Sequence, residues 1–192
     1  MNILIAGIAL FASVHFVPIL APGLRNSLKS KMGNAYKGLF ALSIAAAIGL
    51  IIFGWRDLDW ELIYTPPTWG KHLSAVLMLG AIVLLGAGKR AGHIRKAIRH
   101  PMLTGVTVWS VAHLLANGED RSVVLFGGMG LWALVSMVLI NKRDGAWTKF
   151  AEAHLRNDFK SMAIAIVIFL VILTLHPLFT DVAPYSPLLD FF

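Results

Sequence analysis

Six long apolar runs restrict the fold of this chain more than any other feature of its sequence. A helix needs about 20 apolar residues to cross a hydrocarbon core of roughly 30 Å. We predict membrane-spanning helices over six segments, which are Asn2–Ala21, Ala35–Gly54, His72–Gly88, Pro101–Asn117, Ser122–Ile140 and Ser161–Phe179. Only 14% of the residues are charged, against about a quarter in soluble domains, so a soluble fold is excluded. The sequence predicts one all-α domain over residues 1–192, a polytopic helical bundle with about six transmembrane helices.

The distribution of charge between the runs predicts how the bundle is oriented. Basic residues gather in the loops after the first, third and fifth segments, whereas the alternate loops carry mainly acidic residues. Short loops rich in Lys and Arg stay in the cytoplasm. Both termini are therefore expected on the outer side. The net charge of +7 then reflects topology and contact with anionic membrane lipid, and no nucleic-acid partner is expected.

Two loops carry local predictions of their own. Pro66 and Pro67 interrupt any helix between Tyr64 and Trp69, which predicts an extended connector on the outer membrane surface. The stretch 141–160 is long enough for an amphipathic helix on the cytoplasmic surface.

Two of the seven histidines are predicted to lie at membrane depth. His15 falls within the first segment and His113 within the fourth, roughly 9 and 18 Å from their cytoplasmic ends. Polar groups at such depth are costly and mark functional sites. The chain has no cysteine, and a histidine pair from different helices suits haem, whose iron accepts one imidazole on each face. The alternative is that each histidine only forms a hydrogen bond to a neighbouring helix.

The densest motif runs from Arg99 to Gly118, in the fourth segment. Pro101 suits the first helical position and Gly118 suits the C-terminal cap. One slowly turning face carries a residue every four positions, namely Gly105, Trp109, His113 and Asn117. Such a face offers close approach, an aromatic plane and a polar group, which is typical of a cofactor contact and also of an ordinary helix–helix interface.

This motif, together with His15 and the segments Leu20–Arg25 and Thr65–Leu73, resembles the NnrU family of bacterial membrane proteins over nearly the whole chain. That family is associated with denitrification and nitric-oxide metabolism, and it is similar to the 15-cis-zeta-carotene isomerases, which are haem b proteins. The resemblance implies a multi-pass protein of the bacterial inner membrane with periplasmic termini and haem b as cofactor. Redox chemistry, or isomerisation of a lipid-like polyene, is the activity it implies.

The resemblance also implies a set of site residues. The isomerase ligands are a histidine in an early span, followed by a Leu-Arg pair, and the histidine of a Trp-x-x-Ala-His motif. These positions correspond to His15 and His113 as iron ligands, with Trp109 beside the second. Independently of the resemblance, Arg25, Arg95 and Arg99 at the cytoplasmic ends are candidate contacts for the haem propionates, with a role as topology signals as the alternative for each. His100 is a further candidate cofactor contact. Ser110 replaces the isomerase cysteine, which excludes thiolate exchange at that position.

Two other functional classes stay open at this point. An Arg-His-Pro-x-x-x-Gly segment also opens a helix in membrane methyltransferases, where it helps to hold S-adenosylmethionine. The matching residues are Arg99, His100, Pro101 and Gly105, with Glu152 and Arg156 as loose candidates for a cofactor clamp. In the second class, the chain is a cofactor-free accessory protein whose histidines pack helices.

Overall fold

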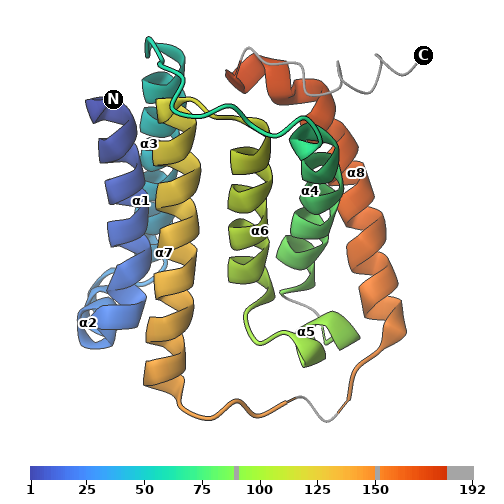
Figure 1. Ribbon diagram of the computed structural model, residues 1–192. Coiled ribbons are helices and arrows are strands. Elements are labelled where there is room, and N and C mark those ends of the chain that lie inside the picture. The colour runs from blue at the N-terminus through green and yellow to red at the C-terminus, as the bar shows by residue number, and fades with distance from the viewer. Residues whose placement is uncertain (89–90, 150–151, 181–192) are drawn as a thin grey trace.

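The computed structural model describes residues 1–88, 91–149 and 152–180, and it is a bundle of long helices (Figure 1). Six long helices correspond to the six predicted segments, namely α1 (Asn2–Leu20), α3 (Ala35–Arg56), α4 (Gly70–Ala87), α6 (Pro101–Ala116), α7 (Asp120–Asp144) and α8 (Leu155–Thr180). In the described part of the chain, five are long and apolar enough to cross a membrane, and α6 is a shorter apolar helix. The predicted polytopic helical bundle is confirmed.

The six long helices form a closed ring in which each packs against two of the others. The order around the ring is α1, α3, α8, α4, α6, α7 and back to α1. The contact between α3 and α8 includes a hydrogen bond of 3.2 Å from the Arg56 guanidinium to the Leu178 carbonyl. The start of α1 and the end of α8 lie at the same end of the bundle (Figure 1). This end is the predicted outer end.

Glycines let α1 and α3 approach each other closely. A Cβ on Gly54 would overlap the backbone of Leu4, and one on Gly7 would lie 2.8 Å from the Ile51 nitrogen. Small residues at such contacts are a common basis of helix packing in membranes. Large apolar side chains cover the outside of the bundle instead, as Leu42 and Val138 show with exposed fractions of 69% and 65%. An exterior of this kind suits lipid.

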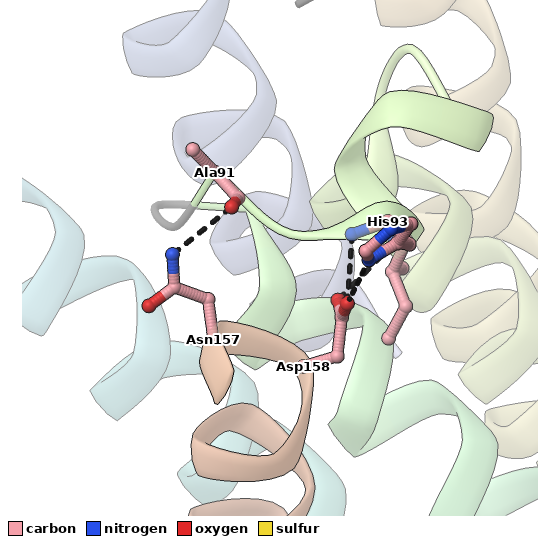
Figure 2. A network of polar contacts seen from close by, with 5 residues as sticks. Ala91, His93, Asn157 and Asp158 are labelled. Atoms are coloured by element: carbon pink, nitrogen blue, oxygen red, sulfur yellow. Dashed lines mark hydrogen bonds and ion pairs between the residues drawn. The ribbon is translucent and has the colours of Figure 1, made fainter. Parts of the chain in front are cut away.

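Two short helices lie in the predicted cytoplasmic loops and were not predicted. One is α2 (Pro22–Met32), and the other is α5 (His93–Ala97). A polar network joins α5 to the start of α8 (Figure 2). Asp158 accepts hydrogen bonds from the backbone nitrogens of His93 (2.7 Å) and Ile94 (3.2 Å). The side chain of Asn157 donates to the Ala91 carbonyl at 2.9 Å, so the first turn of α8 holds the loop before α6.

The predicted amphipathic helix over 141–160 is wrong. Residues 141–144 continue α7, and Leu155 already belongs to α8. Gly145 ends α7 in the left-handed region, with φ of +68°, a conformation that glycine adopts without steric cost. The described residues between the two helices, 145–149 and 152–154, are not helical.

The expected role of Gly118 as a helix cap is also wrong, whereas Pro101 does begin α6. The helix ends at Ala116, and Asn117 is already extended, with φ of −133° and ψ of 129°. The Gly118 carbonyl accepts hydrogen bonds from the nitrogens of Ile63 (2.8 Å) and Tyr64 (3.1 Å). These residues belong to the connector before α4, which is extended as predicted and crosses the end of the bundle where α1 begins (Figure 1).

Candidate functional site

Three aromatic rings surround His15 on α1. Its ring centroid lies 4.2 Å from that of Phe11, 5.1 Å from Trp132 and 5.5 Å from Phe40. The imidazole Nδ1 lies 2.9 Å from the Phe11 carbonyl. Because a carbonyl only accepts, Nδ1 carries the proton, and in the neutral ring Nε2 carries the lone pair.

His113 on α6 has the same local arrangement. Its Nδ1 donates to the Trp109 carbonyl at 2.9 Å, so Nε2 carries the lone pair. Its ring stacks on Phe126 of α7, with centroids 4.2 Å apart and planes 20° apart. The Trp109 ring lies 5.0 Å away on the same helix. Trp109, the candidate contact beside His113, is thus part of the aromatic surroundings of this histidine.

Helix α7 lies between the two predicted ligands and holds them at different levels. It packs against both α1 and α6. The ring contacts of His15 and His113 on α7 are to Trp132 and Phe126, which are six residues, or about 9 Å, apart along the helix. Among the described residues, no ring contact joins His15 to His113. The structure places each histidine against α7 without bringing them together.

The imidazole found close to His113 is that of His176 on α8. The two ring centroids lie 6.5 Å apart, and the planes differ by 20°. His176 lies near the end of the last predicted segment, and it was not among the site residues proposed from the sequence. The sequence feature that could have identified His176 is its position along the helix. His176 and His113 both lie about one turn before the outer ends of their helices.

The basic candidates lie away from His113. His100 Nε2 donates to the Asn141 side-chain oxygen at 2.8 Å, next to the C-terminal end of α7. Arg99 precedes it, and Arg25 on α2 contacts Asn26 at 3.5 Å. The start of α6 is 12 residues from His113, or about 18 Å along the helix, so Arg99 and His100 lie at the opposite end of α6.

The methyltransferase-like motif lies at the start of α6, and its glycine faces α4. A Cβ on Gly105 would lie 2.9 Å from the Ala81 carbonyl, so this glycine serves the packing of α6 on α4. Glu152 forms an exposed ion pair of 4.0 Å with His154. In the described part of the chain, no hydrogen bond or ion pair between Arg99 and either Glu152 or Arg156 is present.

Two buried donors without partners lie near the outer end of the ring, close to Phe126. Within the described chain, Trp55 Nε1 and Arg121 Nε have no hydrogen-bond partner. The Arg121 guanidinium lies 4.6 Å from the Trp55 ring centroid, and Trp55 lies 5.8 Å from Phe126. Buried donors normally have partners, so these two suit the acidic groups of a ligand.

The described residues contain no group of three or more histidine and acidic side chains that could hold a metal ion. A metal at His113 therefore needs most of its ligands from a non-protein group. Haem meets this requirement, because the porphyrin supplies four nitrogens and the protein supplies the axial ligands.

Tyr64 fixes the end of α6 just beyond His113. Its hydroxyl donates to the carbonyls of Leu114 and, at 2.8 Å, Asn117. Burial, and to a smaller extent the charge of Glu119, raises the pKa of Tyr64 above its usual value of 10.0. The phenol thus stays protonated and keeps donating to the helix end.

Replacing Tyr64 with phenylalanine is expected to lower the free energy of unfolding by about 0.5–1.5 kcal/mol and to change its dependence on pH. Because the pKa is higher in the folded state, the unfolded chain loses the proton first as pH rises above about 10, and stability is lost through that range. Tyr64→Phe should lack this part of the alkaline loss, as measured by thermal unfolding in detergent from neutral to alkaline pH. Tyr36→Phe is the control, and an unchanged pH dependence in Tyr64→Phe would contradict the assignment.

The all-helical ring, with its apolar exterior and helices of membrane length, defines a multi-pass membrane protein. The NnrU protein family matches residues 3–184, and the chain belongs to this family. The sequence resemblance is thereby confirmed. No curated protein matches the chain. No solved structure matches it either.

Proposed function

We propose that this protein binds haem b in the bacterial inner membrane through His113 and supports denitrification or nitric-oxide metabolism. The observation that carries the proposal is the hydrogen bond from His113 Nδ1 to the Trp109 carbonyl, inside a predicted membrane segment. Metal-ligating histidines nearly always donate their second N–H in this way, because it fixes the tautomer and orients the ring.

The surroundings of His113 fit a large apolar disc that carries acidic groups. Trp109 and Phe126 provide aromatic surfaces at 5.0 and 4.2 Å from the imidazole. The buried donors of Trp55 and Arg121 suit the two haem carboxylates, because charge-assisted hydrogen bonds are the strong ones. The family resemblance names His15 as the second axial ligand, but His15 and His113 contact α7 at different levels, through Trp132 and Phe126.

Bound haem would supply one-electron chemistry at this site. His113 and a second histidine would hold the iron, and two histidine ligands would favour electron transfer as the activity. Isomerisation of a lipid-like polyene substrate requires one axial ligand to leave. Ser110 stands at the cysteine position of the isomerases, but it is buried against Gly130 of α7. The site thus lacks the isomerase thiol, which supports electron transfer over isomerisation.

An optical spectrum tests the proposal directly. The protein is expressed with added haem, purified in detergent, and measured in its oxidised and dithionite-reduced forms. We expect a sharp Soret band with split visible bands on reduction, and His113→Ala should lose the haem or keep it in a five-coordinate state. His154→Ala, which changes an exposed loop residue, is the control. Wild-type protein without a haem spectrum would refute the proposal.

A further inference from the structure

We propose that His176 of α8, and not His15, is the second axial ligand, so that the haem lies at the outer end of the bundle. This inference rests on the proposed haem function. The His113 and His176 ring centroids are 6.5 Å apart. Two metal–imidazole bonds of about 2 Å separate the two nitrogens by about 4 Å and the ring centroids by roughly 6 Å. The observed separation matches that of two imidazoles on one iron.

The tautomer of His176 also suits a ligand. The Thr180 hydroxyl donates its proton to the His176 carbonyl at 3.0 Å and lies 2.9 Å from the imidazole Nδ1. Where the hydroxyl proton goes to the carbonyl, the hydroxyl oxygen accepts from Nδ1–H, and this tautomer leaves the lone pair of the neutral ring on Nε2. His113 has its lone pair on Nε2 as well. A cation shared by the two rings uses both lone pairs.

The positions along the helices agree with this pairing. His113 lies three residues before the end of α6, and His176 lies four residues before the end of α8, which is about 5–6 Å in each case. Both helices pack against α4, which sets their separation. His15 lies five residues before the end of α1, and this end of α1 is at the opposite side of the bundle (Figure 1).

This placement decides where the haem exchanges electrons. The cofactor lies within about one helical turn of the outer end, so its redox partner or apolar substrate approaches from the outer side of the membrane. Trp55 and Arg121 lie at the same end and are the donors for the carboxylates. Arg25, Arg99 and His100 lie at the other end and act in topology and helix packing.

Single histidine variants of the full chain, purified with haem, separate the two ligand assignments. The readouts are haem content, optical spectra and electron paramagnetic resonance of the ferric protein. We expect His15→Ala and the His154→Ala control to keep the low-spin spectrum of the wild type. We expect His176→Ala to become high-spin and to recover the low-spin signal when imidazole is added. A low-spin His176→Ala together with a high-spin His15→Ala would overturn the assignment to His176.

A second substitution replaces His176 with a different iron ligand, so that the test does not depend on whether His176→Ala folds. His176→Met is expected to keep iron six-coordinate and to raise the reduction potential, because thioether ligation does so in cytochromes. A merely structural His176 would leave potential and spectrum unchanged, which would overturn this inference alone. Wild-type protein without any haem would instead overturn the proposed function as well.

Discussion

Replacing Gly118 with alanine is expected to reduce sharply the amount of folded protein. A Cβ at this buried position would overlap the carbonyl oxygen of Tyr64 and lie 3.1 Å from the Pro66 ring. Neither group can rotate away, because one is backbone and the other is a proline ring. We expect a loss at or above the upper end of the roughly 1–3 kcal/mol typical of overpacking. Thermal unfolding in detergent, with the yield of monodisperse protein, measures it.

Gly127→Ala on α7 is the matched control for this substitution. Nothing lies within 4 Å of a Cβ built there, and alanine favours a helix over glycine by roughly 0.5–1 kcal/mol. Gly127→Ala should therefore unfold at the wild-type temperature or slightly above it. If Gly118→Ala did the same, the connector would not pack against residue 118 as the structure describes.

The membrane segments were predictable because hydropathy reports the solvent around each helix. The ends of a membrane helix that extend beyond the hydrocarbon are less predictable. The residues there are polar, and hydropathy does not distinguish a polar helix end from a loop. The predicted segment Ser122–Ile140 thus became a helix from Asp120 to Asp144. The last segment likewise begins earlier than predicted, at Leu155.

The site was only partly predictable. The position of His113 within an apolar segment marked it as costly and therefore of interest, and the structure shows the local hydrogen bond typical of a ligand. The neighbours of a helix do not follow from hydropathy, because lipid-facing and protein-facing residues are similarly apolar. The order of the ring places α8 beside α4, and this order brings His176 close to His113.

The role of Gly118 could not be predicted from the sequence either. A glycine after a helix predicts a cap, since the pattern is local. Its actual role depends on the connector 58–67, which is more than fifty residues earlier in the chain. A glycine required by close approach across such a distance has no local sequence signal.

Replacing Asp158 with alanine is expected to lower the free energy of unfolding by about 1–3 kcal/mol. Its carboxylate satisfies two backbone N–H groups at the start of α5 and also accepts from the His93 ring at 3.0 Å (Figure 2). The Asp158 side chain is only 14% exposed, but water can reach the His93 donors, so each lost hydrogen bond costs about 0.5–1.5 kcal/mol. Thermal and chemical unfolding in detergent measure the loss.

Two variants show which part of this network carries the stability. His93→Ala removes the ring contact but keeps both backbone hydrogen bonds to Asp158, so its loss should be clearly smaller. Glu152→Ala removes an acid that is 86% exposed, and exposed ion pairs contribute little, so no measurable change is expected. The order of stability should therefore be Glu152→Ala, His93→Ala and then Asp158→Ala. Equal stability of Asp158→Ala and Glu152→Ala would mean that water replaces the carboxylate at the start of α5, and that α8 does not hold this loop.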